Sequence, residues 1–326
     1  MSLTRRSMLI FSGGSIAELL LSARCSWAEA WPQRSLRVIV GFQVGGTADV
    51  VARLAGRQLE ALIGTPVVIE NRAGASGVMA ANFVRTTDDD HTLLMVSETY
   101  IVTPLINGNA GFKVARDFKL IGVVAEGPQV VLATSDAPFH TFDEFAKFAG
   151  RASTGVAYAT SGFGHPQHLI GEYLAAKLPA KLVHVPTRGG GAAVNDLLTG
   201  TVNLAILGLG PTFRLIQAGR LVPLAVSTAK RVSALPQVPT LAELGFSGFS
   251  APQWLGFVAP RTLADAHVNL LSSELQKASG HPALRENFAA LGLTPVFLGA
   301  AEMAARIAEE EERWRSIVVA AHLVSK

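Results

Sequence analysis

The sequence has little cysteine, a balanced charge and no long apolar run. Its 326 residues contain a single cysteine, Cys25, which excludes a disulfide framework and a cysteine-based zinc site. The 28 Lys and Arg against 25 Asp and Glu are spread along the chain rather than gathered into a basic block. Nucleic acid is therefore not an expected partner. The sequence also lacks an uninterrupted apolar stretch of about 20 residues, the length that spans a bilayer.

The first 30 residues have the pattern of an export signal. Arg5 and Arg6 precede an apolar run that reaches Leu21, and a small-x-small site at residues 28–30 closes the segment. The paired arginines favour a twin-arginine signal, although a general secretory signal can also carry two arginines. Both routes predict cleavage after Ala30 and an exported, periplasmic protein without cysteine. A buried N-terminal helix is the weaker alternative, because the arginines would have no acidic partner there.

From Leu36 onward, β-branched runs alternate with segments of helical periodicity, the pattern that produces parallel sheets with helices on both faces. We expect strands at residues 36–40, 66–70, 92–96, 119–124, 129–133, 155–159, 181–185, 203–207, 222–226 and 254–258. We expect helices at residues 47–62, 76–84, 142–148, 166–178, 192–198, 211–218, 263–279, 281–291 and 300–319. The predicted fold class is therefore α/β, with doubly wound sheets.

The mature chain of about 296 residues exceeds one ordinary doubly wound domain. Glycine and proline mark two candidate crossings, at residues 126–128 and 247–252. If the chain leaves the first lobe at one crossing and returns at the other, lobe 1 comprises residues 31–126 and 251–326, and lobe 2 comprises residues 127–250. Two crossings form a hinge, and the cleft between hinged lobes is a favoured ligand site.

Four loops that follow predicted strands are rich in glycine and small polar residues, at residues 41–49, 71–77, 160–166 and 185–191. In open α/β sheets a ligand lies at the carboxyl ends of the strands, where helix N-termini offer free N–H groups and a partial positive charge. These loops are therefore the candidate ligand site.

The two loops of lobe 1 resemble anion cradles without a lysine. Gly45 and Gly46 let the backbone approach a ligand, and Thr47 is expected to cap the next helix while its neighbours offer N–H groups to an anion. A plain tight turn with an N-cap is an equal alternative. In the second loop Ser76 is the expected cap, and Arg72 is either a ligand contact or a lid over the loop.

The two loops of lobe 2 repeat this chemistry. The loop at residues 160–166 opens another helix, so two anion cradles could face each other across a cleft. In the last loop Arg188 is placed to hold a carboxylate bidentately, with a surface arginine as an equal alternative.

The loops contain no complete reaction motif. The first lacks the lysine of a P-loop, and residues 74–78 fail the last position of a nucleophile elbow. Ser161 and His165 lie four residues apart, but nothing specifies a third group to orient the base. His165 and His168 have the spacing of metal ligands without a third ligand, and capping with packing explains them better. We therefore predict no catalytic residue, metal or cofactor.

Short segments in a fixed order carry a family resemblance. They are WP at 31–32, LRVIV at 36–40, GGTADVVAR at 45–53, PVVIENRAGA at 66–75, TLLM at 92–95, LVHVP at 182–186, AGRL at 218–221, LAVS at 224–227, LPQVPT at 235–240 and WLGFVAP at 254–260. Each is weak alone, but their order and spacing are specific. In them the chain resembles the Bug family, the extracytoplasmic receptors of tripartite tricarboxylate transporters, from Trp31 to the C-terminal helix.

The resemblance implies a two-lobed, type II periplasmic binding architecture with an organic carboxylate between the lobes and no enzymatic activity. In the family, backbone N–H groups and water bridges from the first-strand loop hold the carboxylate, together with the Ser-Gly loop of the second lobe. The matching residues here are Gly45, Gly46, Thr47, Asp49, Thr160, Ser161 and Gly162. The rest of the expected wall is Asn71, Ala75, Ser76, Ser97, Pro186, Thr187, Arg188 and Gly189.

The resemblance also implies partners. We expect a monomer that binds a small carboxylate and then docks, closed, on membrane permease subunits that this chain does not encode. One rival is an exported α/β hydrolase that uses Ser161 or Ser76. Another is a sensor that presents its ligand to a signalling membrane protein, which the sequence does not distinguish from a transport receptor.

Four departures from the family pattern concern the ligand. Members usually carry two prolines at residues 43–44, a Tyr-Lys pair at residues 187–188, a small residue where Glu98 stands and an Asp-Asn pair near residues 207–208. These departures are compatible with the family's binding mode, but they do not identify the ligand. The missing second-lobe acid disfavours a cationic or amino-acid ligand, although Asp49 could still pair with one.

Overall fold

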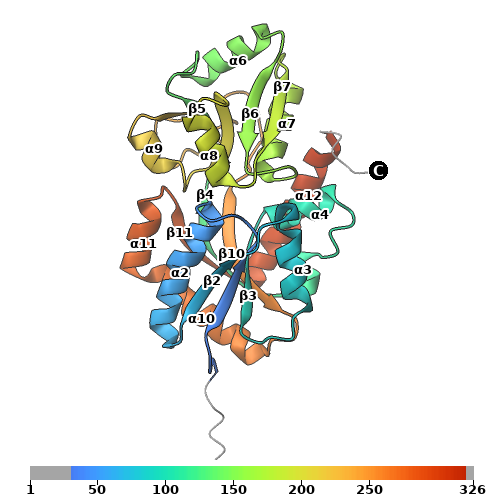
Figure 1. The fold of residues 1–326 in the computed structure, drawn as a ribbon, viewed down its shortest axis with the longest axis vertical. Helices are drawn as coiled ribbons and strands as arrows, with labels where there is room; N and C mark the ends of the chain where they lie inside the picture. The colour runs from blue at the N-terminus through green and yellow to red at the C-terminus, as the bar shows by residue number, and fades with distance from the viewer. Residues whose placement is uncertain (1–30, 321–326) are drawn as a thin grey trace, which may run out of the picture. The chain divides into compact units, whose positions relative to one another are not determined.

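The computed structural model describes residues 31–320, so the predicted export signal lies outside the described residues. The strands form two sheets (Figure 1). The first, of order β11-β4-β10-β3-β1-β2, contains β1 (Leu36–Val40), β2 (Val67–Asn71), β3 (Thr92–Ser97), β4 (Phe118–Gly127), β10 (Gln253–Pro260) and β11 (Thr294–Gly299). The second, of order β7-β6-β8-β5-β9, contains β5 (Gln129–Thr134), β6 (Val156–Thr160), β7 (Leu182–Pro186), β8 (Leu204–Gly208) and β9 (Leu221–Val226).

Helices follow most of the strands. They are α2 (Thr47–Ile63), α3 (Val78–Thr86), α4 (Thr99–Ile106), α5 (Val114–Asp117), α6 (Phe142–Arg151), α7 (Pro166–Lys177), α8 (Gly190–Leu198), α9 (Phe213–Gln217), α10 (Asp265–Gly280), α11 (Pro282–Ala289) and α12 (Ala300–Ala320), with a 3-10 turn, η1 (Ala75–Gly77), before α3. Each strand and helix expected from the sequence is present, with bounds that differ by a few residues at most.

The sheets are mixed, which corrects the prediction of parallel sheets. Strand β1 pairs in parallel with β2 and β3, but β10 is antiparallel to β3 and β4, and β5 is antiparallel to β8 and β9. The physical reason is the route by which the polypeptide enters these strands. Strand β5 enters the second sheet directly from β4 of the first sheet, after Pro128 alone, so no crossover helix fixes its direction relative to its neighbours β8 and β9.

Three elements escaped the sequence prediction: α4, α5 and β11. Helix α4 contains a β-branched run and Pro104, both of which disfavour a helix, and most of its residues are buried. Its burial therefore overrides its low helix propensity. Strand β11 contains Pro295 and pairs with β4 through an irregular register at the edge of the sheet, where proline is tolerated.

Helices cover both faces of each sheet. In Figure 1, α2, α10 and α11 lie on one side of the first sheet, and α3, α4 and α12 lie on the other. In the second sheet, Val131 and Ala133 of β5 join a hydrophobic cluster with α6 and α7, whereas Val130 and Leu132 join a cluster with α8 and α9. This alternation is that of a strand buried on both faces.

We refer to each sheet with its helices as a lobe. The chain passes from the first sheet to the second between Gly127 and Gln129, and it returns between Val226 and Gln253. The predicted lobe bounds and hinge segments remain predictions, because strand membership does not show which residues move together.

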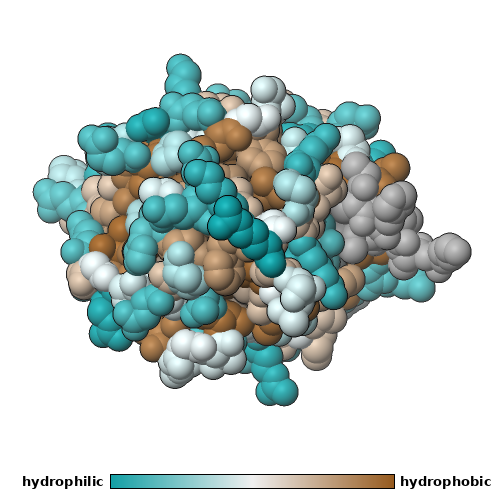
Figure 2. Space-filling view, turned by 90° about the horizontal axis from the view of Figure 1, so that it is seen from above, coloured by the Kyte–Doolittle hydropathy of each residue, from teal (hydrophilic) through white to brown (hydrophobic). Residues whose placement is uncertain are grey.

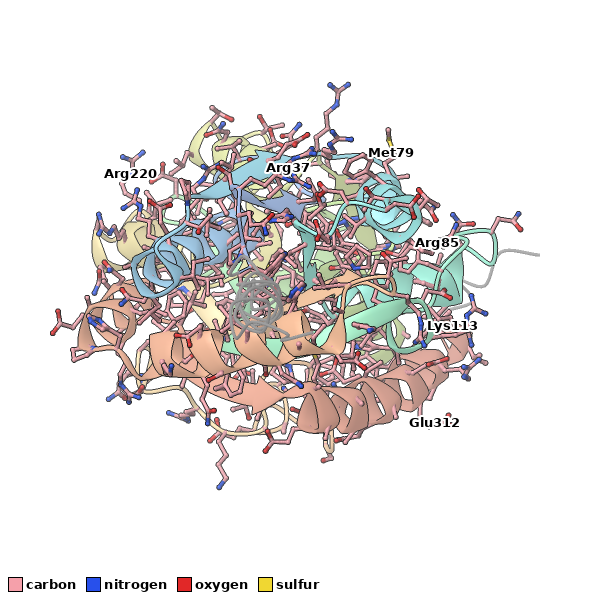
Figure 3. All side chains as sticks on the ribbon, turned by 90° about the horizontal axis from the view of Figure 1, so that it is seen from below. Arg37, Met79, Arg85, Lys113, Arg220 and Glu312 are labelled. Carbon is pink, nitrogen blue, oxygen red and sulfur yellow. The ribbon has the colours of Figure 1, made fainter. Side chains whose placement is uncertain are left out.

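The surface carries charge around a buried core. Charged side chains such as Arg85, Lys113 and Glu312 lie at the periphery of the view in Figure 3. Hydrophobic residues show in Figure 2 as small patches between hydrophilic ones. Within residues 31–320, no helix combines the length and apolarity needed to cross a membrane.

Gly256 tests the packing of the central strand β10. A Cβ at this position would lie 2.7 Å from the Gly122 carbonyl oxygen and 3.2 Å from Val123 Cα, both backbone atoms of β4. We expect Gly256→Ala to lower the free energy of unfolding by about 1–3 kcal/mol in urea denaturation, because backbone cannot move aside as a side chain can. The control is Gly280→Ala at the end of α10, where a Cβ meets nothing within 4 Å. Equal stabilities of the two variants would contradict this packing.

Candidate ligand-binding cleft

The N-terminus of α2 is open. Its N-cap is Gly46, in extended conformation, and no side chain of the described chain caps it. Thr47 is the first helical residue rather than the cap, which corrects the prediction, because the cap position falls on the preceding glycine. The first N–H groups of a helix have no intrahelical acceptor, so those of Thr47 and Ala48 are available to a ligand.

Asp49 braces the loop before α2. Its carboxylate accepts hydrogen bonds from Gly45 N (3.0 Å), Arg53 Nη2 (2.8 Å) and Asn71 Nδ2 (2.9 Å), and its side chain is 2% exposed. Burial acts to raise the pKa of Asp49, but the hydrogen bonds from Arg53, Gly45 and Asn71 outweigh it and lower the pKa. Asn71 also donates to the Phe42 carbonyl oxygen at 3.1 Å. Asp49 and Asn71 therefore hold the loop rather than line the cleft.

A second open helix N-terminus comes from the other lobe. Helix α8 has Gly189 at its N-cap, no acidic residue in its first turn and no capping side chain among residues 31–320. A Cβ on Gly190 would lie 3.4 Å from Ser161 Oγ and 4.0 Å from Gly46 Cα. The two open N-termini, α2 and α8, therefore meet at one place.

At this place lies a pocket that we call the inner pocket. Its lining is Phe42, Gly46, Thr47, Ala48, Ser97, Thr99, Ser161, His165, Gln167, Gly189, Gly190, Gly208, Pro211, Gln253 and Leu255. Its volume is about 40 Å³, space for about three water molecules or one small polar group. Within the described chain, no Asp, Glu, Lys or Arg lines it. The inner pocket is thus free of charged side chains from the described residues, and both lobes supply its lining.

A larger outer pocket of about 410 Å³ adjoins it. Its lining is Gly41, Phe42, Gln43, Ala73, Gly74, Ala75, Ser76, Ser161, Gly162, Phe163, His165, Thr187 and Arg188. Arg188 gives it a cationic group. Ser76 Oγ donates to the Phe163 carbonyl oxygen at 2.8 Å, and this hydrogen bond joins the two lobes.

Three residues line both pockets: Phe42, Ser161 and His165. The rings of Phe42 and His165 pack edge to face, with centroids 5.5 Å apart. Burial, and to a smaller extent His168, lowers the pKa of His165 to about 4, so its ring is neutral near pH 7. The two pockets are therefore separated by an uncharged aromatic pair.

A chain of hydrogen bonds runs behind the inner pocket. Ser161 N donates to Gln167 Oε1 (2.9 Å), and Gln167 Nε2 donates to Gln129 Oε1 (3.0 Å). Gln129 Nε2 donates in turn to Glu98 Oε1 (2.8 Å). Sequence reasoning noted Glu98 only as a departure and missed both glutamines. Their wide separation in sequence gave no signal that they would meet.

The predicted site residues divide into two groups. Gly46, Thr47, Ala75, Ser76, Ser97, Ser161, Gly162, Thr187, Arg188 and Gly189 line one of the two pockets. Gly45, Asp49, Asn71, Thr160 and Pro186 do not, and contacts explain three of these: Asp49 and Asn71, described above, and Thr160. Thr160 Oγ1 lies 2.7 Å from His184 Nε2, and its carbonyl oxygen accepts from Thr187 Oγ1 at 2.8 Å.

Ser76 does not cap a helix, which corrects a further prediction. Its φ of 53° and that of Ala75, 46°, lie in the left-handed region, and the residue before α3 is Gly77. The hydroxyl is instead engaged with the other lobe. Such conformations cost energy in residues other than glycine and are often found at ligand sites.

The histidines are explained by packing. His168 stacks on His184 with centroids 3.9 Å apart, and its Nδ1 accepts from Gly164 N at 3.3 Å. Burial is the first cause that lowers the pKa of both, that of His184 to about 3. These contacts favour the structural interpretation of His168 over metal binding.

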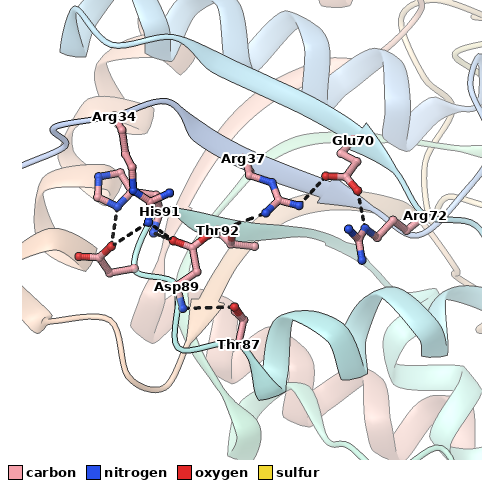
Figure 4. A network of polar contacts seen from close by, with 9 residues as sticks. Arg34, Arg37, Glu70, Arg72, Thr87, Asp89, His91 and Thr92 are labelled. Atoms are coloured by element: carbon pink, nitrogen blue, oxygen red, sulfur yellow. Dashed lines mark hydrogen bonds and ion pairs between the residues drawn. The ribbon is translucent and has the colours of Figure 1, made fainter.

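Within residues 31–320, a group of acidic and histidine side chains, Asp89, Asp90 and His91, lies directly before β3 (Figure 4). Asp89 pairs with Arg34 there and accepts from His91 N at 3.1 Å. Although burial raises the pKa of Asp89, hydrogen bonds from Thr92, Arg34 and His91 lower it to about 2. An ion pair between Arg37 and Glu70 continues this network across β1 and β2. The network ties the strands of the first sheet together.

Comparison with known proteins identifies the family. Residues 51–323 match the family described as the tripartite tricarboxylate transporter family receptor. Protein BugT of Bordetella pertussis is 32% identical over 324 residues, which cover 98% of each chain. The chain belongs to this receptor family. The resemblance to the Bug proteins that the sequence segments indicated is therefore confirmed.

Solved structures of similar proteins share the fold of this receptor. R. palustris Rpa4515, solved with adipate, has a TM-score of 0.86 and 29% identity, over 90% of this chain and 99% of its own. MatC from Rhodopseudomonas palustris, with bound malate, has a TM-score of 0.82 and 26% identity, over 88% and 100%. Family and neighbours are binding proteins of two-lobed α/β architecture, as the sequence predicted.

Asp49 provides a test of the loop architecture. We expect Asp49→Ala to lower the free energy of unfolding by about 2 kcal/mol at pH 7, because it removes an acceptor that holds three partners. The pKa of Asp49 is lowered in the folded protein, so its contribution is complete above the unfolded pKa of about 4 and is lost as pH falls through the folded pKa. The variant should therefore lose less stability than the parent between pH 5 and pH 3.

The measurement is urea denaturation at several pH values. The matched control is Asp88→Ala, since Asp88 is exposed. If Asp49→Ala behaves like this control at pH 7, Asp49 does not brace the loop.

Proposed function

We propose that this receptor binds a small organic carboxylate across the inner and outer pockets and delivers it to the membrane subunits of a tripartite transporter. The observation that carries the proposal is the meeting of two open helix N-termini, from different lobes, at a neutral pocket. Each N-terminus carries about half a positive charge and a set of free N–H donors. Together they match the charge and the lone pairs of one carboxylate.

The dimensions favour an acid with more than one polar group. The inner pocket of about 40 Å³ accommodates a carboxylate head and little else, whereas the outer pocket of about 410 Å³ leaves room for the rest of the ligand. Arg188 lines the outer pocket and can hold a second acid group. Related proteins solved with adipate and malate support a dicarboxylate.

Binding can close the lobes without any other source of energy. A ligand that touches Thr47 in one lobe and Ser161 in the other stabilises the closed form over the open one. The Ser76 to Phe163 hydrogen bond adds a contact between the lobes. We propose lobes of residues 31–126 with 251–326 and of residues 127–250, hinged at 126–128 and 247–252.

Location and partners follow from the same proposal. Residues 1–30 carry an export signal, and the mature receptor acts in the periplasm as a monomer. The closed form docks on membrane permease subunits. Membership of a transporter receptor family supports this assignment.

The serines favour a receptor over a hydrolase. The hydroxyl of Ser76 donates to a backbone carbonyl, which is not a base. For Ser161 the hydrogen bond within the described residues is made by its backbone N–H, which donates to Gln167, and none joins its hydroxyl to a histidine or carboxylate. A serine nucleophile requires a hydrogen-bonded base that a third group orients, and neither contact supplies one.

The function is tested by native mass spectrometry of the purified mature protein, followed by a thermal-shift screen of mono-, di- and tricarboxylates, aromatic acids and amino acids. A bound acid, or one that raises the melting temperature by about 5 °C or more at 100 times its dissociation constant, is the expected result. Turnover of an ester or amide, with no carboxylate shifting the melting temperature, would overturn the proposal.

A further inference from the structure

Glu98 lies directly behind the inner pocket. Its chain neighbours Ser97 and Thr99 line the pocket, whereas Glu98 itself is 1% exposed and does not. Its Oε2 accepts from Trp254 N at 3.2 Å, and Trp254 stands between two further lining residues, Gln253 and Leu255. The buried carboxyl group of Glu98 is thus connected to the lining of the inner pocket through its own segment and through β10.

The hydrogen-bond chain that ends on Glu98 has one direction. Ser161 N can only donate, so Gln167 must present Oε1 to it and Nε2 to the next residue. Gln129 must then accept through Oε1 and donate through Nε2, which requires an acceptor at the far end. Glu98 supplies that acceptor. The orientation of both amides therefore depends on the group at position 98.

The hydrogen-bond chain also contacts both segments in which the polypeptide crosses between the lobes. Gln129 begins β5, just after the first crossing, and Trp254 lies in β10, just after the second. Gln129 N donates to Ser227 Oγ at 3.0 Å, and Ser227 Oγ donates to the Ala251 carbonyl oxygen at 2.7 Å. Glu98, in the first lobe, is thus bonded to both connecting strands and, through Gln167, to the ligand loop of the second lobe.

The charge of Glu98 matters because of its position. Among the ion pairs of residues 31–320, none includes Glu98. Burial, and then the negative charge of Glu310, raises the pKa of Glu98 to about 8, so the group is largely neutral at pH 7. Glu310 accepts from Trp254 Nε1 at 2.9 Å and pairs with Arg306 and Arg313, each at 3.2 Å.

Two other titratable side chains near the pocket, His165 and Tyr100, do not change charge between pH 7 and pH 9. Burial lowers the pKa of His165 to about 4, and burial raises that of Tyr100 above its ordinary value. A pH dependence of binding in this window therefore reports on Glu98.

We propose that Glu98 is a positioning residue for ligand binding, because it terminates the hydrogen-bond chain that holds the Ser161 loop (residues 160–166) against the first lobe. This inference rests on the proposed function and deepens it. Ionised Glu98 would repel the ligand carboxylate, so ligand binding and the proton on Glu98 favour each other. Binding should therefore weaken as pH rises through the range in which Glu98 loses its proton.

The first experiment needs no ligand. Amide hydrogen exchange is measured at Ser161 in the full mature receptor, in Glu98→Ala and in Glu274→Gln. Glu274 is a mostly buried acid of the first lobe that pairs with Lys277, and it is not part of the hydrogen-bond chain between Ser161 and Glu98. We expect at least tenfold faster exchange at Ser161 in Glu98→Ala, because both amides lose their fixed orientation, and no change in the control. Equal exchange in all three proteins would overturn the proposal.

The second experiment measures the affinity for malate and adipate by calorimetry at pH 7, 8 and 9. In the parent, affinity should fall about threefold or more over this range. Glu98→Gln has no charge to lose but has one fewer acceptor, so its affinity should be lower at pH 7 and nearly constant with pH. Glu98→Ala should bind at least tenfold more weakly at pH 7, with the melting temperature of each variant measured to show that it is folded.

The outcomes separate the two proposals. If the parent binds one of the acids and Glu98→Gln keeps the parent's pH profile, Glu98 is not the group that couples to the ligand. If the parent binds neither acid, the carboxylate proposal loses support, while exchange at Ser161 still decides whether Glu98 holds the loop.

Discussion

The meeting of two helix N-termini at one neutral pocket is the feature on which the rest of the cleft depends. Glycine at the N-cap of α8 contributes to it, since Gly189 has a φ of 142° and a Cβ there would lie only 3.3 Å from Gln43 Cβ of the other lobe. The free N–H groups of α2 and α8 then point to the same small volume. Because the donors come from different lobes, an anion there satisfies both only when the lobes are together.

The surroundings keep this pocket free of side-chain charge. Asp49 lies near it in sequence, but Arg53 and Asn71 satisfy its carboxylate outside the lining. His165 lines the pocket in its neutral form. Dipoles and hydroxyl groups are left to balance a ligand's charge, and among the described residues that line the two pockets the one Lys or Arg is Arg188, in the outer pocket. The inner pocket would thus recognise one acid group of the ligand, and the outer pocket has space for a second.

Much of the fold could be predicted from the sequence because its signals are local. The glycine after α2 and the alternating apolar runs placed strands and helices within a few residues. The antiparallel course of β5 and β10 could not be predicted in this way, because it depends on where the chain crosses between sheets. Helix α4 was missed because Pro104 and β-branched residues oppose a helix that burial stabilises.

The candidate site shows the same limit. Loop composition pointed to Gly46, Thr47 and Ser161, which line the inner pocket. It gave no indication that Gln129 and Gln167 would connect Glu98 to Ser161, because two of the three contacts join residues 38 and 31 positions apart. Caps were also misassigned, since a serine or threonine near a helix start does not show which residue adopts the extended cap conformation.

The most direct test of the central claim is a two-dimensional ¹H–¹⁵N spectrum recorded while the acid selected by the thermal-shift screen is added. The account predicts large downfield shifts of the amide protons of Thr47, Ala48, Gly190 and Gly191 at saturation, since each N–H group would donate to a carboxylate. Saturation with no change at these amides would show that the acid binds elsewhere, and it would contradict recognition by the two helix N-termini.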